Sequence, residues 1–129
     1  MSEIRIPVAT GELLDKITIL RIKSERIADP DKLANVRREL SLLEGIWAGI
    51  DAGDARVADC IDRLKEVNEA LWEIEDRIRV KESRSNFDQD FIELARSVYF
   101  TNDKRAAIKR EINDLTGSTL TEEKSYEEY

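Results

Sequence analysis

The stretch CIDRLKEVNEALWEIEDRI, residues 60–78, decides the fold of this chain. Its apolar side chains recur three or four positions apart, at Cys60, Leu64, Val67, Leu71, Ile74 and Ile78. This spacing places them on one face of an α-helix, and the pattern is longer than a typical strand. We therefore expect a long helix that starts near Ala55 and ends near Ser83.

The same spacing resumes after a turn at residues 84–86. A second long helix carries Phe91, Leu94, Val98, Ile108, Ile112 and Leu115 and ends at Gly117. Arms of about 28 residues would each extend about 42 Å, so the two helices form an elongated antiparallel hairpin. A break at residues 101–103, capped by Asn102 or Asp103, is the alternative to the continuous helix that we favour.

A shorter hairpin precedes the long one. We expect a helix over residues 11–27 with Thr10 as its N-cap, and a second helix that starts at Asp29-Pro30 and ends before residues 51–54. Arms of about 28 Å cannot cover the whole apolar seam of the long hairpin. The part of the apolar seam that stays uncovered predicts a homodimer in which the two long helices form the interface.

The predicted fold class is therefore all-α, an elongated bundle of two antiparallel helical hairpins with four helices. Residues 1–117 form a single helical-bundle domain, with a short extended arm over residues 3–8. Residues 118–129 form an acidic tail that includes Glu122, Glu123 and Tyr126.

The composition excludes several classes of function. The chain has no histidine, one cysteine and one methionine, which excludes His-based acid/base catalysis and Cys/His metal sites. A net charge of −7 argues against nucleic acid as a partner. We expect no cofactor. The start of the chain does not resemble a secretory signal, and no apolar run is long enough to span a membrane, so we expect a cytoplasmic protein.

Polar residues interrupt the apolar seams halfway along the long hairpin. In the second long helix the seam passes through Thr101 and Arg105 before it returns to Ile108. Beside the seam of the first long helix runs a polar line of Lys65, Asn68, Trp72, Glu75, Arg79 and Glu82. An antiparallel register about the turn places Asn68 level with Asn102, and Lys65 next to Arg105. A polar layer inside the bundle is the consequence.

An arginine beside a lysine inside a bundle needs an anion, because an unpaired buried charge is costly. Glu69 or Asp62 of the same chain could supply it, and so could a bound molecule. The second possibility gives a candidate ligand-binding set of Asn68, Trp72, Glu75, Asn102, Arg105 and Lys109. No catalytic residue can be assigned.

A metal site is not predicted. The acidic series Glu66, Glu69, Glu73 and Asp76 invites comparison with the all-helical nucleotide pyrophosphohydrolases, which hold magnesium between separate helices. Here all four carboxylates lie on one helix, and one helix cannot surround an octahedral ion. We interpret the series as a solvated acidic face.

Four segments carry a resemblance that covers nearly the whole chain: GELLDKITIL (11–20), ALWEIEDRIR (70–79), ARSVYFTNDKRAAIKREIN (95–113) and EEKSY (122–126). The chain resembles a bacterial family of small all-helical proteins of unknown function. The resemblance implies a gene neighbourhood of glycosyltransferases and surface-polysaccharide assembly, and it marks Asp15, Trp72, Asn102 and Arg105 among the polar residues of the pattern. It implies no activity.

Two functions follow as hypotheses. The first is a non-enzymatic interaction or accessory module that dimerises and has a protein partner in envelope glycan biosynthesis. The second is a small-molecule binder or enzyme that acts on an anionic metabolite such as a nucleotide sugar.

Overall fold

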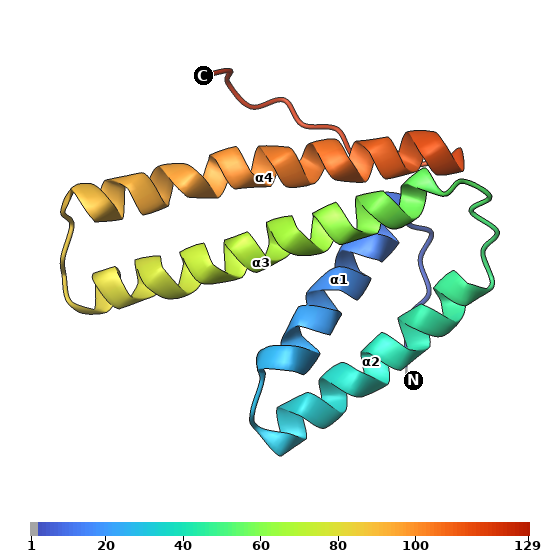
Figure 1. The fold of residues 1–129 in the computed structure, drawn as a ribbon, viewed down its shortest axis with the longest axis horizontal. Coiled ribbons are helices and arrows are strands. Elements are labelled where there is room, and N and C mark those ends of the chain that lie inside the picture. The colour runs from blue at the N-terminus through green and yellow to red at the C-terminus, as the bar shows by residue number, and fades with distance from the viewer. Residues whose placement is uncertain (1–2) are drawn as a thin grey trace.

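A computed structural model describes residues 3–129, and the described chain is all-α, as predicted. The helices are α1 (Thr10–Arg26), α2 (Pro30–Ala48), α3 (Arg56–Ser83) and α4 (Gln89–Thr116) (Figure 1). The prediction of a continuous final helix is confirmed, because α4 passes through residues 101–103 without a break.

The helices form a long pair and a shorter pair that meet at one end. α3 and α4 lie side by side and run in opposite directions, as Figure 1 shows. α1 contacts both of them near the start of α3 and the end of α4, and then diverges from them. α2 returns along α1, and its backbone lies next to no other helix of the described chain. α1 is therefore the central helix of the fold.

The hydrophobic core lies where α1, α3 and α4 meet. Its buried members are Leu13, Leu14, Ile17, Val57, Cys60, Leu64, Ile108 and Ile112. Burial of a side chain of this size contributes about 1.5–3 kcal/mol. α2 has no buried residue, although its Trp47 packs half-buried against this core. The end of the molecule that holds α1 is thus the best packed.

Two of the predicted helix boundaries are confirmed by their caps. Asp29 accepts hydrogen bonds from the backbone N–H groups of Asp31 and Lys32 at the start of α2. Gly117 ends α4 in the left-handed conformation, with φ of 63°. Both residues perform the roles that their types favour.

The predicted N-cap of the first helix is wrong. Thr10 is already inside α1, and the preceding Ala9 has no side chain that can cap it. The free N–H of Gly11 instead donates to Asn113 Oδ1 on α4, at 2.7 Å. Another helix therefore caps α1, which no local pattern can predict.

The two ends of the chain lie against this part of the molecule. Residues 3–9 and 118–129 have no helix or strand. The tail runs back along α4 (Figure 1), where Glu122 pairs with Lys109, Glu123 with Arg110, and the Tyr129 hydroxyl with Asp103. No helix among residues 3–129 has the length and apolar character needed to cross a membrane.

Candidate functional site

A buried ion pair lies at the centre of the fold. The Asp15 side chain on α1 is 1% exposed, and it accepts two hydrogen bonds from the guanidinium of Arg105 on α4. The Nε–Oδ1 distance is 2.9 Å. These hydrogen bonds raise the pKa of Arg105 above its usual value. The sequence left Glu69, Asp62 or a bound molecule as the source of an anion for Arg105 and Lys65. Asp15 of α1 supplies it for Arg105, whereas Glu69 lies 3.9 Å from Lys65.

Asn68 on α3 joins the same centre. Its Nδ2 donates to Asp15 Oδ1 at 2.9 Å and to Thr18 Oγ1 at 3.0 Å. A carboxylate can only accept, and the Thr18 hydroxyl already donates to the Asp15 carbonyl, so the amide nitrogen must face α1. The Asn68 Oδ1 atom therefore points the other way.

Lys109 lies on the other side of Asp15. Its Nζ is 2.8 Å from Glu12, 2.9 Å from Glu122 and 3.8 Å from Asp15. Burial lowers the pKa of this ammonium group, but the hydrogen bonds to Glu12 and Glu122 outweigh burial and hold the pKa above its usual value. Lys109 thus joins the tail to α1.

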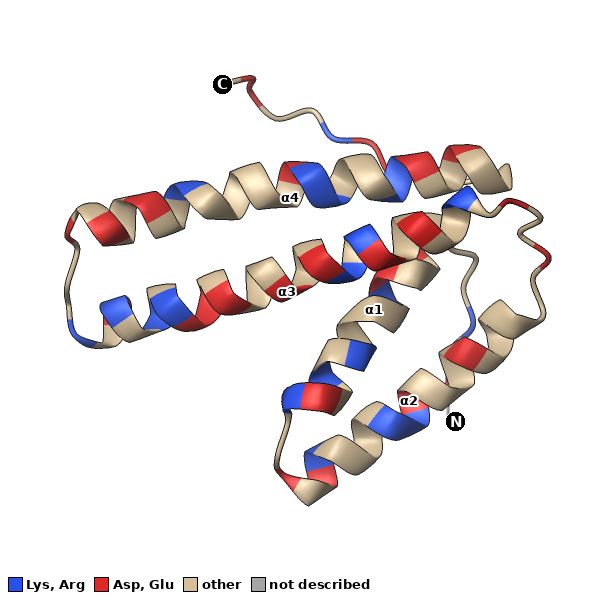
Figure 2. Cartoon of the chain, in the orientation of Figure 1, with Lys and Arg blue, Asp and Glu red and all other residues tan. Residues whose placement is uncertain are grey.

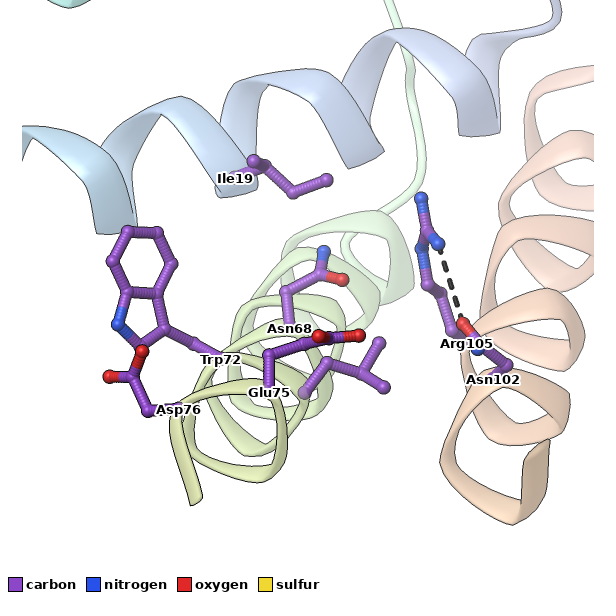
Figure 3. Close-up of a pocket in the computed structure, with 8 residues that line it drawn as sticks. Ile19, Asn68, Trp72, Glu75, Asp76, Asn102 and Arg105 are labelled. Carbon is purple, nitrogen blue, oxygen red and sulfur yellow. Dashed lines mark hydrogen bonds between the residues drawn. The ribbon is translucent and has the colours of Figure 1, made fainter. Parts of the chain in front are cut away.

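A cleft of about 450 Å³ opens beside the Asp15 centre, where α1 diverges from the long pair. It is lined by Ile19 of α1, by Asn68, Leu71, Trp72, Glu75 and Asp76 of α3, and by Asn102 and Arg105 of α4 (Figure 3). Five of the six candidate ligand-binding residues therefore line one cleft. The sixth, Lys109, lines a smaller hollow between the N-terminal arm and the tail.

The polar register of the long pair differs in detail from the expected one. Asn68 and Asn102 line the same cleft from α3 and α4, and the Asn102 Oδ1 accepts from Arg105 Nη1 at 3.5 Å (Figure 3). Lys65, expected beside Arg105, instead pairs with Glu25 of α1 at 2.7 Å. The second cation near Arg105 is Lys109.

Once its ion pairs are counted, the lining of the cleft carries the negative charge of Asp76 and no unpaired cation. Arg105 is the one cation among the lining residues, and Asp15 neutralises it. Glu75 and Asp76 add two carboxylates. Glu75 also pairs with the exposed Arg79, at 3.1 Å. An anion that entered the cleft would therefore meet two carboxylates and no free cation of the lining.

Trp72 is half-buried at the α1 side of the cleft. The Arg26 guanidinium lies over its ring, 5.8 Å from the centroid, and is held there by Glu73 and Glu69. Ile19 and Leu71 line the same cleft as this indole. The cleft thus combines an apolar wall with a polar floor.

The acidic series of α3 does not form a metal site. Glu69 and Glu73 pair with Arg26, whereas Glu66 and Asp76 are exposed. Within residues 3–129 no group of three carboxylates or thiolates is close enough to hold a metal ion.

The sequence analysis missed Asp15, Thr18 and Glu12 as members of the central network. One local signal was available, because Asp15 and Thr18 stand among the apolar residues of α1 and are 1% and 0% exposed. Asp15 also lies in a segment that carries the family resemblance. The spacing could not show that it faces Arg105.

Comparison with known proteins identifies a family for this chain but no individual relative. The model of a family described as a family of unknown function, DUF6165, matches residues 4–129. No curated protein and no solved structure matches the chain.

Proposed function

We propose, for a chain that belongs to DUF6165, a family of unknown function, that it is a non-enzymatic helical interaction module that forms a homodimer. The dimer interface would be formed by the distal hairpin, defined as residues 74–100. It comprises the end of α3, the turn and the start of α4. A link to envelope glycan assembly and a protein partner there remain predictions that rest on the resemblance.

This proposal rests on the apolar side chains of the distal hairpin, which the other helices leave largely exposed. The ion pair of Arg26 with Glu73 shows that α1 reaches beyond the middle of α3, but Leu94 is the one buried apolar residue of residues 74–100. Five large apolar side chains there are more than a third exposed: Val80, Phe87, Ile92, Tyr99 and Phe100. Exposed apolar surface of this kind is typical of an interface.

The solvent-exposed area of the chain is larger than that of a compact monomer of the same mass, which supports an uncovered interface. The chain exposes 8994 Å². A compact monomer of 14.9 kDa is expected to expose about 7000 Å². The N-terminal arm and the tail account for part of the difference of about 2000 Å². A stable protein–protein interface covers about 800 Å² on each partner, which is less than this difference.

The charges of the distal hairpin favour a second copy of the chain as the occupant. The last turns of α3 carry exposed basic side chains and the first turns of α4 carry exposed acidic ones (Figure 2). They are Arg77 and Arg79 on α3 with Arg84 directly after it, and Asp90 and Glu93 on α4 with Asp88 directly before it. A two-fold axis brings α3 of one copy against α4 of the other, so opposite charges meet twice.

Sedimentation equilibrium tests the proposal. The wild-type chain should sediment as a species of twice 14.9 kDa at micromolar concentration. Ile92→Asp should give a folded monomer, because Ile92 is 47% exposed and its replacement disturbs no buried packing. Leu42→Asp on α2 is the matched control, with 51% exposure, and should remain a dimer. A monomeric wild type, or a monomer caused by Leu42→Asp alone, overturns the proposal.

A small-molecule binder is the second candidate, and the cleft beside Asp15 supports it. The anionic metabolite that the sequence suggested is disfavoured by the negative lining and by the pairing of Arg105 with Asp15. A thermal-shift screen of nucleotide sugars decides this point, since a ligand that contacts Arg105 should stabilise the wild type and not Arg105→Ala.

A further inference from the structure

We infer that the tail, residues 118–129, is an autoinhibitory segment that competes with a second copy of the chain for the distal hairpin. The inference rests on the proposed homodimer, and it adds a regulator of the same surface. Three features support it. They are the path of the tail along α4, the contacts of Tyr129 with two apolar residues of the distal hairpin, and the exposed attachment of the tail.

The tail follows the face of α4 that leads to the proposed interface. Glu123 of the tail pairs with Arg110 at 3.0 Å, and the Tyr129 hydroxyl donates to Asp103. Spacings of seven, four and seven residues connect Arg110, Asp103, Tyr99 and Ile92. These spacings place the four side chains on one face of the helix. The tail therefore lies on the same face of α4 as the exposed Ile92.

The Tyr129 ring occupies part of the distal hairpin. Its centroid is 4.8 Å from that of Phe100, edge to face, and 5.3 Å from that of Tyr99. Tyr99 and Phe100 are two of the five large apolar side chains that the proposed dimer would cover. Packed helices have axes about 8–10 Å apart, which leaves no room for a third ring between them. A partner helix that docks on Tyr99 and Phe100 must therefore displace Tyr129.

The attachment of the tail allows this displacement. Residues 119–129 are all exposed and have no helix or strand. The Glu122 and Glu123 side chains that pair with α4 are 48% and 76% exposed. Ion pairs of this exposure add little stability, and segments with few buried contacts open at a low cost in free energy. The tail can thus leave α4 while the core stays folded.

Competition makes the two events oppose each other. A tail bound to α4 weakens dimerisation, and dimerisation weakens the attachment of the tail by the same factor. The tail belongs to the same chain, so its effective concentration at α4 is fixed, whereas that of the second copy rises with protein concentration. The chain should therefore change from a monomer with a bound tail to a dimer with released tails as its concentration rises.

Sedimentation equilibrium of a shortened chain tests the inference. A chain that ends at Ser125 lacks Tyr129 and should dimerise about tenfold more tightly than the wild type, because each of two copies otherwise gives up aromatic contacts worth about threefold. Tyr129→Ala should have the same effect. Tyr126→Ala is the matched control and should leave the dissociation constant unchanged, since Tyr126 is 83% exposed and its ring contacts no aromatic ring of residues 3–129.

The outcomes separate the competition from the proposed dimer. Equal dissociation constants for the wild type and Tyr129→Ala, or weaker dimerisation of the shortened chain, overturn the competition and leave the dimer in place. If the wild type and the shortened chain both stay monomeric at every concentration, the dimer and the competition fail together.

NMR of the Tyr129 ring gives a second measurement. Its signals, identified by their absence in Tyr129→Ala, are shifted by the ring currents of Tyr99 and Phe100. These shifts should decrease as the concentration of the wild type rises, and they should persist in Ile92→Asp. Ring signals that stay constant while the wild type dimerises contradict the displacement.

Discussion

Arg105 on α4 and Asp15 on α1 are 90 residues apart in the sequence, and their side chains form a bidentate ion pair at the point where three helices meet. Asn68 connects the pair to α3. A buried ion pair gains little over apolar packing in net free energy, but it penalises every arrangement that separates its partners. This pair therefore specifies which surface of α1 faces the long hairpin.

Removal of the Asp15 charge should destabilise the fold strongly. Asp15→Asn leaves Arg105 in place without its counterion, and we expect the free energy of unfolding in urea to fall by about 3 kcal/mol. Replacement of both residues by leucine should cost less than the sum of the two single leucine changes. Glu75→Gln, which breaks only an exposed pair with Arg79, is the control and should leave the urea midpoint unchanged. Additive leucine changes would contradict the coupling.

Two glycine substitutions should have opposite effects. A Cβ at Gly11 would lie 2.5 Å from the backbone oxygen of Lys109, so Gly11→Ala forces α1 away from α4, and we expect a loss of about 1–3 kcal/mol. Gly45 in α2 has no atom within 4 Å of the same position, so Gly45→Ala should stabilise the chain by about 0.5–1 kcal/mol. Thermal unfolding measured by circular dichroism distinguishes them. If Gly11→Ala leaves the stability unchanged, α1 and α4 do not approach each other so closely.

The attachment of the tail should weaken in acid. The hydrogen bond from Lys109 lowers the pKa of Glu122 below its ordinary value of 4.5. A carboxyl group with a lowered pKa stabilises the attached state above its ordinary pKa, and this contribution disappears as the pH falls through the lowered value. Amide hydrogen exchange of residues 118–129 should therefore accelerate below pH 4.5 relative to the helical core.

Two variants control for the tail experiment. Glu122→Gln should remove most of this acid dependence, because it replaces the group that titrates. Glu127→Gln changes an exposed residue of the same tail and should keep the dependence. If amide exchange of the tail still accelerates in acid in Glu122→Gln, another carboxylate causes the acid dependence and our assignment is wrong.

The two ends of the long hairpin should differ in local stability. The core lies among residues 57–68 of α3 and 108–113 of α4, whereas the distal hairpin has one buried apolar side chain. In Ile92→Asp, which we expect to be monomeric, backbone amides of residues 74–100 should exchange faster than those of the core. In the wild type, the proposed dimerisation should make their protection increase with protein concentration. Uniform protection in the monomer would contradict this gradient.

The sequence predicts the helices well because their signals are local. The three-and-four spacing, the Asp29-Pro30 start and the Gly117 end act within a few residues, and each appears in the structure at the expected place. The unbroken α4 follows from the same spacing, since Thr101 and Arg105 keep the helical phase even though they are polar.

The origin of the central carboxylate could not be predicted from spacing. Register within the long hairpin placed Asn68 level with Asn102, and these two residues do line one cleft, together with Arg105. The carboxylate comes from α1, and its position depends on how the two hairpins pack. The cap of α1 by Asn113 depends on the same packing, which is why Thr10 was wrongly assigned.

The one-sided attachment of the shorter hairpin has a mechanical consequence. The N-terminal half of α1 is fixed by the core and by Asp15, whereas its last turn is tied to α3 by partly exposed ion pairs of Arg26 and Glu25 and by the contact of Arg26 with the Trp72 ring. Dissolved salt screens partly exposed ion pairs, so a rise in ionic strength should loosen this end of α1 before it affects the core.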